Sequence, residues 1–457
     1  MAMRSAREPL GRAARLWLCV AAFVAGVHAH ASAQTANVPA DPDLASPPLH
    51  GRALASWRSA FELIRRGAPE YLAALEQIER RGGEQRIALG HVLPSANGRL
   101  GFTRELLTTR RSYGTGVVEI EPQNLWSSSA SFAVPLIDLA AWRALGTADR
   151  MRALAREEFD DVRRTLALRV VDAIFAAVLA QRLAEADRTA LRSALERQLL
   201  TQQMEQLGRG SSLDVDRTEH DALQARAQLL AQDELLLRRR EELGSLLGTA
   251  SALTPTLALD LAPMAAAIAA VCRPTPELDQ RADVVAARRR VELAARAVDS
   301  VAFQALPSVL LASRVGWDHS QVYGARGASW DIQALLNVPI WDGGARYGER
   351  RALRAEQRAA LIELKQVRIR AALSVVQAAR SVRLAEATHG LHTSAHAVAR
   401  RLDERTRAAY SQGRGTGLDL LKAAEALREA ERQRWVSELE LARSHAAALL
   451  SHADCRF

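Results

Sequence analysis

The sequence predicts a mainly α-helical protein made of two tandem repeats, each contributing two strands to a membrane β-barrel and a pair of long antiparallel helices. Three observations lead to this fold class. One short motif occurs twice, two stretches of more than seventy residues lack proline, and four stretches alternate between apolar and polar side chains.

The first 33 residues have the order of a secretory signal peptide. Four arginines precede an apolar core at residues 16–27, and the small residues that follow predict cleavage after Ala33. The apolar core is too short to span a bilayer as a helix. We therefore expect an exported chain whose mature part begins with a short segment, residues 34–51.

Composition and cysteine content narrow the class of protein. The chain has a net charge of +9, with arginines interspersed among Glu and Asp, which favours solvated helix faces over a nucleic-acid-binding patch. A hydrophobic content of 48% with only 5% aromatic residues is typical of long helices packed through small side chains. Cys272 and Cys455 can form one disulfide in an oxidising compartment or remain two free thiols.

The duplicated motif reads G-R-G-[ST]-x-L-D-[VL] and starts at Gly208 and again at Gly413. Two other motifs recur in the same order, L-P-S and V-P-[LI]-x-D. A tandem duplication accounts for all three. It predicts repeat 1 at residues 52–250, a linker at 251–272, repeat 2 at 273–450 and a C-terminal tail at 451–457.

The alternating stretches predict two strands in each repeat. They lie at about residues 95–107 and 124–135 in repeat 1 and at about 308–318 and 328–339 in repeat 2. Alternation is weakest in the first of them, where Arg104 and Glu105 interrupt it. Strands of this length fit either a soluble sheet lying on a core or tilted membrane-spanning strands, and the period does not choose between the two.

The proline-free stretches predict two very long helices. They are rich in strong helix formers and extend over about residues 139–207 and 345–412, roughly 105 Å each. Shorter helices at about 213–248 and 417–450 return from them. A helix of this length needs other helices beside it along its whole length.

The duplicated motif fits the turn between these helices. Its first glycine suits the left-handed residue that ends a helix, its Ser or Thr suits an N-cap, and its Asp suits the third position of a capping box. Capping does not explain the Arg and Leu of the motif, so capping alone and capping combined with partner docking both remain open. The hairpin tips are residues 208–214 and 413–419.

Four strands cannot close a barrel, and open strand edges in lipid leave backbone groups unpaired. Three chains would supply twelve strands, within the range of outer-membrane barrels. The same trimer would surround each long helix with neighbours. We therefore expect a homotrimer with a twelve-stranded barrel that continues into an α-helical barrel.

In this order, twice, and after a signal peptide, these motifs resemble the TolC-like outer membrane efflux proteins over about residues 52–450. The resemblance implies a trimer in outer-membrane lipid whose helical barrel extends into the periplasm. It implies a periplasmic adaptor (membrane fusion) protein and an inner-membrane pump, of resistance-nodulation-division or ABC type, as partners. An acid of the family's entrance falls at Lys422 here, so we expect a less acidic entrance.

The resemblance also assigns roles to the motifs. The two tips would form the tunnel entrance and the adaptor docking site, and the V-P-[LI]-x-D motifs would lie at the barrel-to-helix junctions. The entrance residues are Gly208, Arg209, Gly210, Ser211, Leu213, Asp214, Gly413, Arg414, Gly415, Thr416, Leu418, Asp419 and Lys422. The junction residues are Pro135, Asp138, Pro339, Asp342, Gly343 and Gly344.

We therefore predict a passive exit duct for small molecules in a tripartite efflux system. A duct for type I protein secretion and a soluble periplasmic coiled-coil adaptor or structural protein are the alternatives. No nucleophile, phosphate-binding or dinucleotide motif indicates an enzyme, and no cofactor is expected. His389, His392 and His396 share one helical face and could bind a metal, but no carboxylate or Cys completes the set, and a solvated face explains them as well.

Overall fold

A computed structural model describes residues 42–45, 51–113, 116–120, 124–256, 261–275, 277–318 and 327–456. The predicted signal peptide and most of segment 34–51 lie outside these residues. The chain divides into two compact units. The tip unit contains residues 187–230 and 405–422 with the N-terminal residues 42–45, and the sheet unit contains residues 51–186, 231–404 and 423–456 as far as they are described.

Long helices dominate the chain. α4 spans Leu139–Gln206 and α8 spans Ala345–Ser411, and they are followed by α5 (Ser212–Leu246) and α9 (Gly417–Leu450). The 68 residues of α4 and the 67 of α8 correspond to about 100 Å each. The shorter helices are α2 (Trp57–Gly67), α3 (Pro69–Gly90), α6 (Leu261–Val271), α7 (Ala282–Gln304) and the 3-10 helices η1 (Pro42–Leu44) and η2 (Leu278–Gln280).

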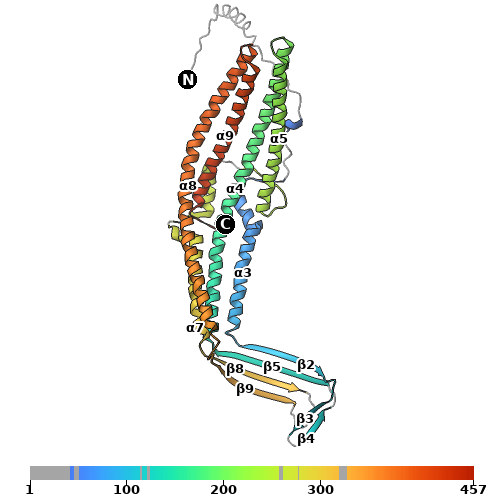
Figure 1. The fold of residues 1–457 in the computed structure, drawn as a ribbon, viewed down its shortest axis with the longest axis vertical. Coiled ribbons are helices and arrows are strands. Elements are labelled where there is room, and N and C mark those ends of the chain that lie inside the picture. Colours follow the sequence, from blue (N-terminus) through green and yellow to red (C-terminus); the bar gives the residue numbers. More distant parts are fainter. Residues whose placement is uncertain are drawn as a thin grey trace, which may run out of the picture. The chain divides into compact units, whose positions relative to one another are not determined.

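A four-stranded antiparallel sheet in the order β2-β5-β8-β9 follows from both repeats (Figure 1). β5 and β8, one from each repeat, pair in the centre, so β2 and β9 are the edges. The register of β5 shifts between Pro135 and Ile137, where proline removes a backbone donor. The strands are β2 (Ser95–Arg104), β5 (Asn124–Ile137), β8 (Ser308–Asp318) and β9 (Ala328–Asn337).

The sheet has one apolar and one polar face, because residues paired across all four strands point the same way. The rings of Phe102 and Trp126 lie 4.8 Å apart on the apolar face, and Trp330 Nε1 donates to Ser313 Oγ at 3.1 Å. The register places Leu100, Phe102, Trp126, Ala130, Phe132, Val315, Trp317, Trp330, Ile332 and Leu336 on the apolar face. It places Arg99, Ser127, Ser129, Ser131, Arg314, Asp331 and Gln333 on the polar face.

The first repeat carries a hairpin that the alternation did not predict. β3 (Thr109–Tyr113) and β4 (Gly116–Ile120) lie between β2 and β5 in the sequence. They pair antiparallel with each other as a separate two-stranded sheet. The first strand was expected to reach residue 107, but β2 ends at Arg104. The charged pair Arg104 and Glu105 ends its alternation, and the longer first loop has room for a second turn.

The core of the sheet unit forms where α2 and α6 pack with α4, α5 and α9. Phe61, Ile64, Ile174, Leu243 and Ile268 are among its buried side chains. In the predicted linker, residues 251–272, the structure describes α6 and the short strand β6 (Leu253–Pro255), which pairs in parallel with β1 (Arg52–Leu54).

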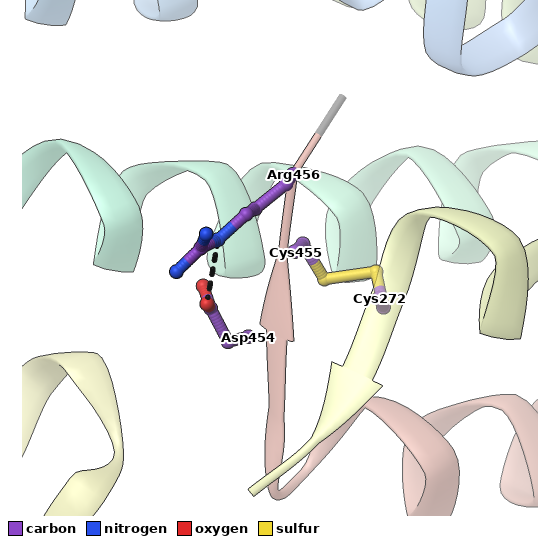
Figure 2. The surroundings of a disulfide bond; sticks show 4 residues. All are labelled: Cys272, Asp454, Cys455 and Arg456. Atoms are coloured by element: carbon purple, nitrogen blue, oxygen red, sulfur yellow. Dashed lines mark hydrogen bonds and ion pairs between the residues drawn. A yellow bond between two sulfur atoms is a disulfide. The ribbon is translucent and has the colours of Figure 1, made fainter.

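The C-terminal tail is bound covalently to this linker. β10 (Ala453–Cys455) pairs with β7 (Cys272–Pro274), and Cys272 and Cys455 lie opposite each other and form a disulfide (Figure 2). The two cysteines are 183 positions apart and at most 2% exposed. The Arg456 amide also donates to the Val271 carbonyl at 2.6 Å. Of the two states that the sequence left open, the structure forms the disulfide.

Within the described ranges, none of the helices combines the length and the apolar character needed to cross a bilayer.

Candidate functional site

Both hairpin tips lie in the tip unit, and each begins with the same helix-ending turn. Gly208 and Gly413 have φ angles of +69° and +71°, which favour glycine. In the first turn the Gly208 amide donates to Glu205 and the Arg209 amide to Met204, both at 2.8 Å. The second turn repeats both bonds. This double bond pattern is a Schellman motif, which uses the last carbonyls of the helix, as the sequence predicted.

The second glycine of each G-R-G is required by a close approach of the backbone and not by a positive φ angle. A Cβ at Gly210 would lie 2.9 Å from the Glu205 amide nitrogen, and one at Gly415 would lie 3.2 Å from the Tyr410 amide nitrogen. The chain therefore folds back directly onto the end of the helix it has just left. The repetition of G-R-G contained this signal, because a single glycine is enough for the helix-ending turn.

The second tip forms the complete capping box. Thr416 Oγ1 accepts from the Asp419 amide at 3.2 Å, while Asp419 Oδ2 accepts from the Thr416 amide at 3.4 Å and from its hydroxyl at 2.6 Å. These bonds from the Thr416 hydroxyl and amide lower the pKa of the Asp419 carboxyl, and the nearby Lys422 ammonium acts in the same direction. The carboxylate is thus held in its charged form by the turn it closes.

The first tip differs from the prediction. Ser211 Oγ accepts from the Leu213 amide at 3.2 Å, so it is an N-cap, and the Asp214 amide donates to the Ser211 carbonyl at 2.9 Å. Among the described residues, however, no bond from Ser211 to the Asp214 carboxylate completes a capping box. The Asp214 carboxylate accepts from Arg217 Nη1 at 3.3 Å instead. It also lies against Gly417 of the second tip, where an added Cβ would overlap it. Asp214 and Asp419 are equivalent in sequence and not in contacts.

A small apolar cluster fixes the two tips against each other. Tyr410, at 4% exposure, packs with Met204 and Leu420. Within the described residues its hydroxyl has no hydrogen-bond partner. Burial raises the pKa of Tyr410, and the charge of Asp214 raises it further. Sequence reasoning missed Tyr410 as a site residue, although it lies three residues before the motif.

A buried ion pair joins α4 and α5 close to the first tip. Arg197 Nη2 donates to Asp221 Oδ2 at 2.7 Å, and the side chains are 3% and 9% exposed. One helical turn nearer the tip, the Thr201 and Thr218 hydroxyls lie 2.7 Å apart. These contacts join α4 to α5, so the position of the tip is set by side chains outside the motif.

The remaining motif side chains point outward. Leu213 and Leu418 are 52% and 43% exposed, and Arg209, Arg414 and Lys422 are exposed or half-buried. Among the described residues, the Arg414 side chain bonds within its own turn, to Gln412. The tips therefore present leucine and arginine from both repeats on one unit, a surface chemistry suited to contact with another protein.

The junction motifs cap the long helices in the sheet unit. Asp138 Oδ1 accepts from the Ala141 amide at 2.8 Å at the start of α4. Asp342 accepts from the amides of Gly344 (3.0 Å) and Arg346 (3.1 Å) before α8. Desolvation opposes ionisation of Asp342, but these bonds and the Arg346 side chain lower its pKa. Gly343 and Gly344 have positive φ angles. Pro135 lies at the register shift of β5, and Pro339 follows the end of β9.

In the part of the chain that the structure describes, no carboxylate or cysteine joins the histidine face to form a metal site. His389 Nδ1 lies 3.4 Å from Ser437 Oγ, and His392 and His396 are half-exposed. Among the described residues, no group of three or more His, Cys, Asp or Glu side chains is placed to hold a metal ion.

The sequence is similar to a known protein family and to individual proteins of known function. Residues 62–249 and 275–451 match the outer membrane efflux protein family. The fusaric acid resistance protein FusA of Burkholderia cepacia is 25% identical over 308 residues, 64% of this chain and 56% of FusA. The protease secretion protein PrtF of Dickeya chrysanthemi is 27% identical over 215 residues, 45% of this chain and 44% of PrtF. The chain thus matches about half the length of each.

Solved structures share the fold. The outer membrane protein VceC of Vibrio cholerae has a TM-score of 0.69 at 18% identity, covering 86% of this chain and 95% of VceC. The CmeC outer membrane channel of Campylobacter jejuni has a TM-score of 0.72 at 14% identity, covering 90% and 91%. The family match extends over both repeats, and the chain belongs to the outer membrane efflux protein family.

Proposed function

We propose that this chain forms, as a homotrimer, the passive outer-membrane exit duct of a tripartite efflux system. A signal peptide at residues 1–33 would direct its export. The two repeats, at 52–250 and 273–450, would each supply two strands and one helical hairpin. A periplasmic adaptor and an inner-membrane pump would complete the system.

The open sheet is the observation that carries this proposal. Its edge strands, β2 and β9, have ten residues each and are exposed almost throughout. Long unpaired edges promote pairing with another chain. Since β2 and β9 lie on opposite edges, β9 of one copy can pair with β2 of the next. Three copies would close twelve strands and leave no edge in lipid.

The apolar face has the height that a membrane requires. β8 has eleven residues, about 36 Å when extended, and a 40° tilt reduces this to roughly 28 Å. Leu100 and Trp330 on this face are 87% and 72% exposed. A soluble sheet would bury such a face against a core, whereas lipid accepts it uncovered.

α8 supports the same assembly. Six of its exposed apolar residues recur every seven or eight positions, a spacing typical of a helix that packs along a neighbouring helix. They are Ile362 at 61%, Ile369 at 50%, Val376 at 55%, Leu384 at 66%, Leu391 at 70% and Val398 at 55%. Two further copies of the chain would cover this stripe.

We infer that the tips dock the adaptor through Arg209, Leu213, Arg414 and Leu418. Glycine turns and caps account for the other motif residues, and these four are left outward-facing. The name of FusA favours a small-molecule substrate for the duct. The name of PrtF keeps protein secretion as a second candidate, and export of each substrate class by cells carrying this protein would separate the two.

The test replaces the exposed tip leucines with charge. The double variant Leu213→Asp, Leu418→Asp is expected to abolish export by cells that depend on this protein while detergent-solubilised protein still runs as a trimer. Loss of the trimer would make the two leucines structural.

A matched control is available in the same unit. Leu223 and Leu230 on α5 are both 56% exposed and lie outside the tips. Leu223→Asp, Leu230→Asp should keep export. Wild-type protein that fractionates as a soluble monomer would refute the duct itself.

A further inference from the structure

The junction between β9 and α8 carries an exposed aromatic and basic patch that capping does not explain. Ile340, Trp341 and Tyr347 are 86%, 77% and 77% exposed. They follow directly from the apolar face of β9, which Figure 1 shows leading into α8. Exposed tryptophan and tyrosine at the end of an apolar sheet face are typical of a membrane–water boundary, where an amphipathic ring meets both phases.

Arginines continue this patch along α8. The first ten residues of α8 contain four arginines and one glutamate. Arg346 is engaged with Asp342 at 2.6 Å, but Arg350, Arg351 and Arg354 are exposed and have no ion-pair partner in the part of the chain that the structure describes. Cations at a helix N-terminus are disfavoured by the helix dipole. An external anion would offset this arrangement.

The spacing matches the headgroup layer of a bilayer. Tyr347, Arg351 and Arg354 occur at i, i+4 and i+7 and share one helical face. With Tyr347 at the hydrocarbon boundary, Arg351 is about 6 Å and Arg354 about 10 Å further along the helix. The interfacial layer is roughly 5–8 Å thick on each side. Helical side chains lean toward the N-terminus, here toward the sheet, so the guanidinium groups of Arg351 and Arg354 can both reach it.

The first repeat provides an internal comparison. Leu136, Ile137 and Trp142 at the β5–α4 junction are also exposed, at 54%, 51% and 58%. Arg143 is occupied there, because it pairs with Asp299 at 3.3 Å and lies over the Phe303 ring. The duplicated junctions therefore share the apolar part of the patch and one exposed arginine, Arg150 or Arg354, and α8 differs from α4 by the exposed pair Arg350 and Arg351.

We propose that the β9–α8 junction is a phospholipid-binding surface, with Trp341 and Tyr347 in the interface of the periplasmic leaflet and Arg350, Arg351 and Arg354 on the phosphates of anionic lipids. This inference rests on the proposed membrane duct and adds a headgroup site to it. A single arginine near an anionic surface strengthens the attraction to that surface about fivefold. Arg350 and Arg351 are exposed side by side, so the preference should be readily measurable.

Quenching of tryptophan by brominated lipids tests the surface in the intact trimer. The protein is reconstituted with either brominated phosphatidylglycerol or brominated phosphatidylcholine at equal mole fraction, and the Trp341 signal is taken as the difference between wild type and Trp341→Phe. Phosphatidylglycerol should quench this signal at least twofold more strongly. Trp142, read the same way, should be quenched equally by both lipids. Trp435 on α9 lies against the guanidinium groups of Arg182 on α4 and Arg434 on α9, and neither lipid should quench it.

Arginine variants test the phosphate contacts. Arg350→Gln, Arg351→Gln, Arg354→Gln should make quenching of Trp341 by the two lipids equal. The control Arg380→Gln, Arg383→Gln changes two exposed arginines that lie about 40 Å beyond Arg354 along α8, by the helical rise, and should keep the preference. Equal quenching in the wild-type protein would overturn the anionic site.

The failure of this inference differs from failure of the duct. If Trp330 on the apolar sheet face is quenched and Trp341 is not, the sheet faces lipid while water or a neighbouring copy covers the junction, and the lipid surface is refuted alone. If neither residue is quenched, the sheet does not face lipid and the proposed duct is refuted as well.

Discussion

Replacing Cys272 and Cys455 by alanine tests how strongly the disulfide stabilises the fold. The bond joins residues 183 positions apart, and both cysteines are buried in the main core. In the chain-entropy description, releasing a loop of this length costs roughly 5 kcal/mol at 25 °C, with measured values for disulfides commonly lower at 2–4 kcal/mol. The unfolding entropy of a chain of this size is about 0.9 kcal/mol/K, which makes the expected shift in unfolding temperature about 2–6 °C.

The assay is thermal unfolding of the detergent-solubilised protein at a fixed scan rate, since membrane assemblies unfold irreversibly. Each single variant already loses the cross-link, so Cys272→Ala, Cys455→Ala and the double variant should be destabilised by similar amounts. This non-additivity separates the bond from the packing of the two side chains. Additive shifts that are each below 1 °C would refute the reasoning.

Three other perturbations have defined signs. Tyr410→Phe removes a buried hydroxyl that has no partner among the described residues and should stabilise the protein by about 1–2 kcal/mol, measured as a higher unfolding temperature. Gly210→Ala forces a Cβ onto the helix end and should cost about 1–3 kcal/mol, whereas Gly83→Ala, in open space on α3, should stabilise by about 1 kcal/mol. Burial, and then the charge of Asp160, raises the pKa of Glu157 above its usual 4.5. Because the pKa of Glu157 is higher in the folded than in the unfolded protein, its contribution to the free energy of unfolding is complete below pH 4.5. This contribution is lost as the pH rises through the folded-state pKa. The wild type should therefore become more stable on mild acidification, and Glu157→Gln should not show this gain.

Each of these results has a contrary outcome. A Tyr410→Phe variant that is less stable than wild type would mean that the hydroxyl has a partner in the assembly. A neutral Gly210→Ala would mean that the chain does not fold back onto the helix end in solution. Identical pH profiles for wild type and Glu157→Gln would place that carboxyl in solvent.

Local sequence signals predicted the features that local physics determines. Gly208 and Gly413 end their helices because few other residues adopt a positive φ, and the Thr416–Asp419 box closes within four residues. The long helices follow from proline-free, alanine-rich and leucine-rich stretches. In each case the deciding contacts lie within a turn or two of the residue that makes them.

Contacts between distant segments could not be predicted. Asp214 has the same motif position as Asp419, but its carboxylate occupies the space beside Gly417, about two hundred residues away, where a Cβ would otherwise lie. The cysteine pair was left open because the sequence does not show that β7 and β10 meet. The hairpin of β3 and β4 follows a strand whose alternation ends early, so the period gave no signal for it.

The different contacts of Asp214 and Asp419 limit the symmetry of the proposed trimer. In the proposed trimer, six similar loops would surround the entrance, but three would carry an acid turned toward their sister loop and three an acid that closes its own helix. Such a ring has three-fold and not six-fold symmetry. An adaptor with six identical arms would therefore meet two different surfaces in alternation, and its subunits would have to bind as three unequal pairs.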